Sequence, residues 1–229
     1  TGGYDGTGTA IANYWLYTFI GLPTTTNPYE DWIGLGGGSI PVGGDPNGFL
    51  GPGYGFTMKG NPSGAQQYDF RGRANNGTIS VTLNPNRETL VGNPYASALD
   101  ARDFIHDSQN QSNTTGVLKY WEQQAGATSH VLSNYVGGYA LYTISAGGVD
   151  SFTPAPFFMY LLDGSPAGGP PLGPGSKVAK RYIPVGQGFM IEGNGSASNA
   201  VFRNSHRNFY KQSDPDSDFF RETEATTSQ

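Results

Sequence analysis

Short runs of β-branched and aromatic residues recur along the chain, separated by turn residues. Each run has the length of one ordinary strand. The predicted strands are Tyr14–Ile20, Tyr54–Lys59, Tyr68–Arg71, Thr78–Leu83, Val117–Trp121, Tyr139–Ile144, Phe157–Leu162, Gly188–Glu192 and Ala200–Arg203. Thr78–Leu83 alternates polar and apolar positions, which predicts one wet face and one buried face. Asn76-Gly77 before it is a strong hairpin turn, so we expect Tyr68–Arg71 to pair antiparallel with Thr78–Leu83.

A helical pattern occurs in one place, near residues 98–107. Ser97 or Asp100 can cap this helix, and Leu99, Phe104 and Ile105 can share one face. The pattern therefore predicts one or two helical turns there.

The composition supports short strands joined by many turns. The 229 residues include 35 Gly and 16 Pro, and two stretches rich in them, Gly36–Gly48 and Asp163–Ser176, are predicted to be long irregular loops. Aromatic residues make up 13% of the chain, which a disordered polymer would not carry. Only 14% of residues are charged, which argues against coiled coils and helical bundles. We therefore predict an all-β fold, a jelly-roll-like β-sandwich with one short helix.

Charge and cysteine content exclude several classes of function. The chain has no Cys, so disulfides, thiolate catalysis and Cys-ligated zinc are ruled out. A net charge of −5 argues against nucleic acid as a partner, because phosphate binding requires clustered Lys and Arg. No apolar run approaches the roughly 18 residues of a membrane helix, so we expect no membrane span. The chain reads as an excerpt from a longer polypeptide.

Comparison of the chain with itself reveals four landmarks that occur twice in the same order. The pairs are Thr18–Pro23 with Thr89–Pro94, Asp31–Ile33 with Asp103–Ile105, Gly53–Asn61 with Gly186–Asn194, and Phe70-Arg71 with Phe202-Arg203. We expect a single β-sandwich domain over residues 14–211, built from related halves 14–87 and 88–211. Residues 1–13 would be a lead-in, and residues 212–229 an acidic linker or tail.

The repeated G-x-G-F-x-M/I-x-G-N pattern supplies four candidate structural glycines, Gly55, Gly60, Gly188 and Gly193. Each pattern is typical of a turn that opens a strand, with a Gly at its end where a neighbour comes close. No helix pattern follows to bind phosphate. Val at Gly55 or Gly188 is therefore expected to lower stability rather than ligand affinity.

Motifs of the second half carry a family resemblance. They are Leu90-Val-Gly-Asn-Pro-Tyr-Ala-Ser-Ala-Leu-Asp100, Gly137-Gly-Tyr139, Ile183-Pro-Val-Gly-Gln-Gly-Phe189 and Phe202-Arg-Asn-Ser-His-Arg207. The chain resembles, over about residues 14–211, the β-rich region that precedes the type IX secretion sorting domain in large secreted proteins of Bacteroidetes, the flavobacterial group especially. The resemblance implies export to the cell surface of a Gram-negative bacterium, and it implies no catalytic residues.

Signals for catalysis are weak. No G-x-S-x-G occurs, and His106, His130 and His206 lie far apart with no motif around them. We therefore expect no enzyme and assign no catalytic residues. A pair of carboxylates for glycoside cleavage stays open, because any two acids can meet in space.

Calcium is the one cofactor that the spacing of acids suggests. Asp214, Asp216 and Asp218 have the D-x-D-x-D spacing that opens many calcium loops, but the Gly and the distal Glu of the EF-hand pattern are missing. A solvated acidic tail is the simpler interpretation. Asp100, Asp103 and Asp107 could line one helix face, but capping explains at least the first two more simply.

Aromatic residues supply the candidate ligand-binding positions. Tyr120 and Trp121 are adjacent on a predicted strand, so they point to opposite faces and one of them should be exposed. Tyr29, Tyr54, Tyr135 and Tyr139, near turns, are weaker candidates. Their flat rings could stack on the apolar faces of sugars. Trp15 and Trp32 occupy apolar landmark positions, and we assign them to the core.

These observations favour a non-catalytic module of a secreted bacterial surface protein, with an adhesive or structural role and glycan binding as its candidate activity. Extracellular polysaccharide or neighbouring surface-protein chains would be its partners. One alternative is a structural or assembly subunit, or a stalk module of a surface filament. A second alternative is a polysaccharide-degrading enzyme.

Overall fold

The computed structural model describes residues 16–35, 50–58, 72–125 and 134–220, and these form an all-β, sandwich-like fold, as predicted. The main sheet is antiparallel throughout. Its strand order is β10 (Gly173–Pro174), β9 (Pro156–Met159), β7 (Val136–Ile144), β6 (Thr114–Gln123), β12 (Gly188–Gly193) and β4 (Glu88–Gly92), and β8 (Asp150–Thr153) also pairs with β7.

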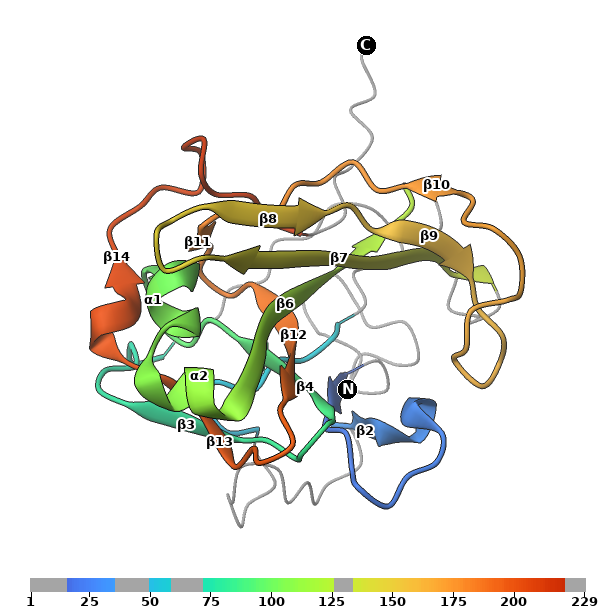
Figure 1. The fold of residues 1–229 in the computed structure, drawn as a ribbon, viewed down its shortest axis with the longest axis horizontal. Coiled ribbons are helices and arrows are strands. Elements are labelled where there is room, and N and C mark those ends of the chain that lie inside the picture. The colour runs from blue at the N-terminus through green and yellow to red at the C-terminus, as the bar shows by residue number, and fades with distance from the viewer. Residues whose placement is uncertain (1–15, 36–49, 59–71, 126–133, 221–229) are drawn as a thin grey trace.

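Smaller sheets and two helices complete the described part of the fold. The remaining strands are β11 (Tyr182–Ile183), β5 (Ala98–Asp100) and β14 (Arg207–Asn208) in one sheet, β13 (Asn199–Phe202) with β3 (Ile79–Thr82), and β1 (Tyr17–Phe19) with β2 (Trp32–Gly34). The helices are α1 (Ala101–Ile105) and α2 (Ser108–Asn113), with 3-10 turns at Pro28–Asp31 and Asn204–His206. Figure 1 shows α1 and α2 on the left of the molecule and β2 at its lower right.

The main sheet has an inner and an outer face, and β6 shows the difference most clearly. Leu118, Tyr120 and Glu122 are buried on the inner face, whereas Lys119 and Trp121 alternate with them and are only half-buried. This pattern confirms that Tyr120 and Trp121 point to opposite faces. Part of the outer face is covered by the β1–β2 hairpin.

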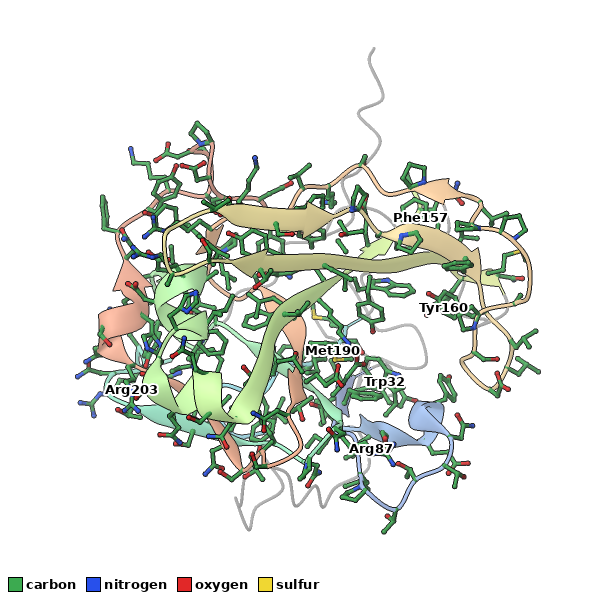
Figure 2. All side chains as sticks on the ribbon, viewed as in Figure 1. Trp32, Arg87, Phe157, Tyr160, Met190 and Arg203 are labelled. Atoms are coloured by element: carbon green, nitrogen blue, oxygen red, sulfur yellow. The ribbon has the colours of Figure 1, made fainter. Side chains whose placement is uncertain are left out.

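The contact between the hairpin and the outer face is apolar. Phe19 of β1 and Trp32 of β2 meet edge to face, with ring centroids 5.0 Å apart, and pack with Leu90 of β4 and Met190 of β12. Figure 2 shows Trp32 and Met190 close together beside the hairpin. Trp32 is therefore half-buried against a small apolar cluster on the outer face, and not in the main core to which the sequence assigned it. Trp15 lies outside the described residues.

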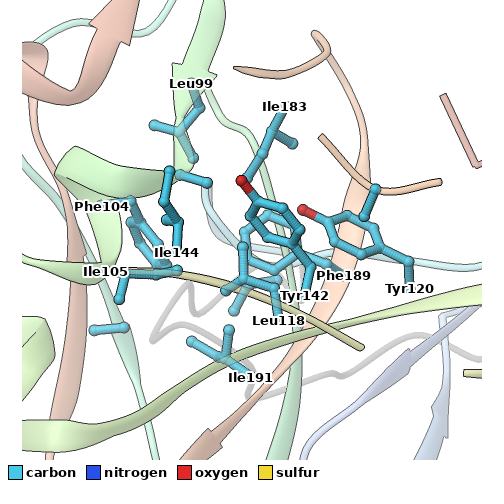
Figure 3. Packing of buried hydrophobic residues seen from close by; sticks show 14 of the residues in the cluster. Leu99, Phe104, Ile105, Leu118, Tyr120, Tyr142, Ile144, Ile183, Phe189 and Ile191 are labelled. Carbon is cyan, nitrogen blue, oxygen red and sulfur yellow. The ribbon is translucent and has the colours of Figure 1, made fainter. Parts of the chain in front are cut away.

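The inner face covers the main core, which α1 helps to fill. The ring of Phe104 stacks on Phe202 of β13 at 4.8 Å and meets Phe189 of β12 edge to face at 5.9 Å. Figure 3 shows Tyr120 and Tyr142 pointing into the same cluster. Because these side chains are buried, truncation of Phe104 to Ala should cost about 3–5 kcal/mol.

Several predicted strands are found close to their expected places. Val117–Trp121 lies within β6, Tyr139–Ile144 within β7 and Gly188–Glu192 within β12. Thr78–Leu83 contains β3, whose observed partner is β13. The expected partner, Tyr68–Arg71, lies outside the described residues.

The predicted helix begins later than the pattern suggested. Ala98–Asp100 form strand β5, and Asp100 is the N-cap of α1, since its carboxylate accepts a hydrogen bond from the Arg102 amide at 3.0 Å. Leu99 is fully buried in the strand rather than on a helix face. Asp107 caps a second helix, α2, that the sequence did not predict.

The segment predicted as a loose tail is packed on the domain as far as Phe220. The Tyr182 amide donates to the Asp216 carbonyl at 3.0 Å, and the Phe220 amide donates to Oε1 of Gln187 at 2.8 Å. The Phe220 ring stacks on Tyr120, with centroids 4.9 Å apart. The predicted boundary at 211 is therefore too early, because aromatic burial holds the following residues in place.

The landmarks of the proposed duplication fit the structure unevenly. Gly53–Gly55 lies along β4, where the Gly55 amide donates to the Leu90 carbonyl at 2.9 Å, and β12 also pairs with β4, Gly188 opposite Gly92. However, Asp31–Ile33 enters strand β2, whereas Asp103–Ile105 lies in helix α1. The origin of the halves by duplication stays a prediction.

The candidate structural glycines differ in how closely they are packed. A Cβ at Gly55 would lie 2.7 Å from the Val91 carbonyl oxygen, and one at Gly193 would lie 2.5 Å from the Asn84 carbonyl oxygen. At Gly188 the nearest atom would be 3.5 Å away, an ordinary contact. Only the first two positions therefore require glycine for space. Gly60 lies outside the described residues.

Candidate functional site

Two of the motifs that carry the family resemblance are joined by one buried side chain. Asn93 is buried, and its Nδ2 donates to the carbonyl oxygens of Ser97 (2.8 Å), Ile183 (3.2 Å) and Pro184 (3.1 Å). Its Oδ1 accepts the Tyr95 amide at 3.1 Å. One side chain thus joins the first motif to the Ile183–Phe189 motif. The geometry is that of a buried, hydrogen-bonded polar group that fixes the fold.

His206 of the last motif also serves the structure. Its Nδ1 accepts a hydrogen bond from the Arg203 amide at 3.2 Å, and its Nε2 lies 3.3 Å from Oδ2 of Asp107. Burial lowers the pKa of His206, although the Asp107 carboxylate opposes this effect. Both ring nitrogens are therefore engaged within the protein, and neither is available to a substrate.

The acids at the helix starts hold arginines rather than a common ligand. Asp100 is buried and binds Arg181 in a bidentate ion pair, in which Nη2 and Oδ2 are 2.7 Å apart. This hydrogen bond raises the pKa of the Arg181 guanidinium. Asp107 binds Nε of Arg203 at 2.7 Å. Asp100 and Asp107 cap different helices, and Asp103 is exposed on α1, so the three do not line one face.

The outer face of the main sheet carries a row of aromatic side chains. Trp121 of β6 lies opposite Tyr139 of β7, and Phe158 of β9 lies opposite Gly137, two residues from Tyr139. Tyr160 follows Phe158 by two, which places it on the same side. All four side chains are half-buried. We call Trp121, Tyr139, Phe158 and Tyr160 the aromatic face.

Trp121 contacts two other rings of the aromatic face. Trp121 lies 5.1 Å from Tyr139 and 5.5 Å from Tyr160, centroid to centroid. The Tyr160 hydroxyl donates to the Gly137 carbonyl at 3.2 Å. A Cβ at Gly137 would lie 2.6 Å from the Trp121 ring, so the glycine makes room for the indole. Burial raises the pKa of Tyr139, and the Glu88 carboxylate and Tyr160 add to the effect.

Three charged side chains lie beside the aromatic face on the same side of the sheet. Glu88 of β4 and Glu192 of β12 stand directly opposite each other, and Lys119 of β6 binds both carboxylates, with 3.1 Å between Nζ and Oε2 of Glu192. Burial lowers the pKa of Lys119, but the two carboxylates outweigh it and raise this pKa above its ordinary value. We call Glu88, Lys119 and Glu192 the charged row.

The predicted ligand-binding residues separate into different places. Trp121 and Tyr139 lie in the aromatic face. Tyr135 precedes β7 and lies near Tyr29. Burial raises the pKa of the Tyr135 hydroxyl, and the neighbouring Tyr29 adds to this effect.

Two of these predictions need correction. Tyr120 is only 2% exposed and packs in the core, because its position on β6 points inward, so it offers no surface to a ligand. Tyr54 lies beside β4, away from the aromatic face, and its hydroxyl accepts the Thr82 amide at 3.1 Å. It stabilises the contact with β3.

The predicted calcium ligands do not come together. No group of three acidic or histidine side chains suited to a metal ion is found in the described residues, which include Asp214, Asp216 and Asp218. Asp216 instead accepts a hydrogen bond from the Tyr210 hydroxyl at 3.3 Å.

Glu122 is a buried acid that the sequence analysis did not single out. Its carboxylate accepts the amides of Ser176 at 2.8 Å and Lys177 at 3.2 Å. A carboxylate that accepts backbone amides is well satisfied without a ligand. Glu122 therefore anchors the loop after β10 to the inner face of β6.

The sequence singled out Trp121 and Tyr139 of the aromatic face, but Phe158, Tyr160 and all of the charged row were missed. The alternation of Lys119 and Trp121 along β6 was the available signal, and Phe158 and Tyr160 show the same period along β9. What the sequence did not supply was the order of strands that brings β4, β12, β6, β7 and β9 side by side.

Comparisons with known proteins give one match. A family described as "Domain of unknown function (DUF8693)" matches residues 8–229. No curated protein and no solved structure matches the chain. Among the helices of the described segments, none is long and apolar enough to cross a membrane.

Proposed function

We propose that this chain, which belongs to the domain family of unknown function DUF8693, is a non-catalytic module of a secreted bacterial surface protein that binds polysaccharide on its aromatic face. The observation that carries the proposal is the row of half-buried rings centred on Trp121, next to the carboxylates of the charged row. Rings of this kind offer a flat apolar surface, and carboxylates accept hydrogen bonds from sugar hydroxyls.

The open part of the outer face supports binding of an extended ligand. Leu141 of β7 lies opposite Lys119, on the same side of the sheet as Tyr139, and its side chain is exposed. The β1–β2 hairpin covers the β4 and β12 side of the face, where Phe19 and Trp32 pack on Leu90 and Met190. A sugar chain would therefore lie over β6, β7 and β9, with the hairpin as one wall.

The secreted setting rests on the family resemblance of the motifs. In the structure Asn93 and His206 of these motifs hold the fold together, which supports a non-catalytic reading of them. Export by a type IX pathway is the mechanism that the resemblance implies.

Trp121→Ala tests the proposed function directly. We expect the affinity for a bound polysaccharide to fall about tenfold or more, because truncation of a central aromatic anchor costs more than 1 kcal/mol. Phe209→Ala is the matched control, since Phe209 is 93% exposed and belongs to a different sheet edge. Affinity electrophoresis against a panel of polysaccharides, followed by calorimetry, gives the measurement. Equal binding by wild type and Trp121→Ala would contradict the proposal, and release of reducing sugars would point to an enzyme.

The assembly-subunit alternative has one observation in its favour. Strands β14 and β11 lie on either side of β5. Phe209 follows β14, Val185 follows β11, and both side chains are exposed. Exposed apolar side chains of this kind occur at protein interfaces. Light scattering over a range of protein concentrations distinguishes the two functions: association that Phe209→Ala abolishes would favour the subunit.

A further inference from the structure

The outer face carries a net negative charge beside the strands over which a ligand would lie. Glu88 and Glu192 are directly opposed on neighbouring strands, an arrangement that is unfavourable for like charges. Lys119 relieves it by binding both carboxylates. Two negative charges and one positive charge leave the charged row with a net charge of −1.

Lys119 is committed to this role. Its side chain is about one-fifth exposed, and its ammonium group is held between the two acids. Lys119 is the only basic residue among the outward positions of β4, β12, β6, β7 and β9. The neighbouring Arg87 donates to the carbonyl oxygens of Pro23 and Thr25 instead. No cation in this part of the described chain is therefore available for an anionic ligand.

The charged row also lies within reach of a ligand on the aromatic rings. Lys119 and Trp121 are two residues apart on one face of β6, a separation of about 7 Å. The Glu88 carboxylate is near enough to Tyr139 to raise the pKa of its hydroxyl. A sugar stacked on Trp121 or Tyr139 would thus carry its substituents into the field of both carboxylates.

We propose that the aromatic face takes uncharged polysaccharide and excludes chains that bear carboxylate or sulfate groups. This inference rests on the proposed function and names its ligand class. Hydroxyl groups of a neutral sugar can donate to Glu88 and Glu192, whereas an anionic substituent meets like charge with no free cation to offset it.

A matched pair of ligands tests the selectivity. The probes are a neutral β-glucan and the same β-glucan after partial sulfation, measured by affinity electrophoresis and calorimetry together with the wider panel of neutral polysaccharides. If the protein does not bind the β-glucan, the ligand pair becomes a neutral polysaccharide from the panel that it does bind and the sulfated form of that polysaccharide. We expect the sulfated form to bind at least tenfold more weakly to the wild-type protein at low salt. Trp121→Ala should abolish binding of the neutral form.

Removal of one acid of the charged row should relax the exclusion. Glu88→Gln or Glu192→Gln keeps the shape of the side chain and brings the net charge of the row to zero. We expect the difference in affinity between the two ligands to shrink severalfold. The neutral form should lose affinity by a smaller factor, because the Gln amide keeps one oxygen that accepts a hydrogen bond from a sugar hydroxyl. Asp103→Asn is the control, since Asp103 is an exposed acid on α1 and its loss changes the overall charge equally.

The outcomes separate the inference from the proposed function. Equal binding of both β-glucans to the wild type, abolished by Trp121→Ala, overturns the selectivity and leaves the function standing. If the Gln variants discriminate between the neutral and the sulfated ligand as strongly as wild type does, the inference is also overturned. Should those variants unfold, 0.5 M salt replaces them: exclusion by charge is screened at this concentration, and exclusion that persists is not electrostatic. Failure to bind any neutral polysaccharide contradicts the proposed function itself.

Discussion

At the scale of single residues, Thr89 is a weak point of the fold. Its hydroxyl is buried in β4 between neighbouring strands, with no hydrogen-bond partner in the described part of the chain. A buried polar group without a partner retains the full cost of its desolvation. Thr89→Val removes this cost and keeps the branched shape, so we expect the free energy of unfolding to rise by about 1 kcal/mol. Urea unfolding measures it, and a destabilised variant would show that the hydroxyl is satisfied.

His206 should make stability depend on pH. Its folded pKa is lowered, chiefly by burial, so the folded protein binds this proton more weakly than the unfolded chain. The contribution of neutral His206 to the free energy of unfolding is therefore complete above the unfolded pKa of about 6.5 and is lost as pH falls below it. His206→Asn keeps an acceptor near the Arg203 amide and cannot titrate. Urea midpoints between pH 7.5 and 5.0 should fall less steeply in the variant than in wild type.

If the urea midpoints of the variant and of wild type fall equally steeply with pH, this role of His206 is contradicted. The range stops at pH 5.0 to keep Asp107 out of the measurement. Burial alone would raise the pKa of Asp107, but hydrogen bonds from Arg203 and the Gln109 amide bring it below its ordinary value, so this carboxylate loses its contribution only at lower pH.

Individual residues also show how far a sequence pattern can lead. Adjacency on a strand predicted that Tyr120 and Trp121 point to opposite faces, and the structure confirms it. The pattern left open which of the two is buried. That depends on Phe104 and Phe189, which come from distant segments and fill the space over Tyr120. Local periodicity gives the alternation, whereas tertiary packing assigns the faces.

At the scale of elements, Gly55 and Gly188 form a matched pair in the two segments that flank strand β4. Gly55→Ala would place a methyl group within 3 Å of Val91 and Leu90, so we expect a loss of about 1–3 kcal/mol through overpacking. Gly188→Ala meets only ordinary contacts, and its effect should stay within about 0.5 kcal/mol. Thermal melting of the two variants provides the comparison. Similar melting temperatures would mean that the backbone around Gly55 gives way easily.

Helix α2 illustrates an element that pattern analysis cannot find. Ser108–Asn113 has no apolar periodicity, because all six residues are polar. The helix exists through side-chain hydrogen bonds: Asp107 caps its start, and Asn110 is fully buried, with Oδ1 accepting the Val201 amide at 2.7 Å and Nδ2 donating to the Val201 carbonyl at 2.9 Å. The sequence does not distinguish an asparagine with this buried role from an asparagine in an exposed loop. Its burial follows only from the docking of β13.

At the scale of the whole molecule, long-range pairing creates the candidate site. Residues 188–192 pair with residues 88–92 and with β6, which places the charged row on three strands from well-separated parts of the chain. Strands of suitable composition were predictable, but their order was not, because strand propensity says little about partners. The all-β class could therefore be derived from the sequence, whereas the outer face could not.

The extent of the domain gives a last prediction at this scale. Phe220 lies in the segment that the composition assigned to a tail, yet its ring stacks on Tyr120 and its amide is held by Gln187. Phe220→Ala should lower the free energy of unfolding by about 2 kcal/mol, less than for a fully buried Phe because the ring is half-buried. Phe209→Ala removes an equal ring from an exposed position and should change stability by under about 0.5 kcal/mol. Urea unfolding of both variants decides the point: if they are equally stable, the segment after 211 rests on the domain without supporting it.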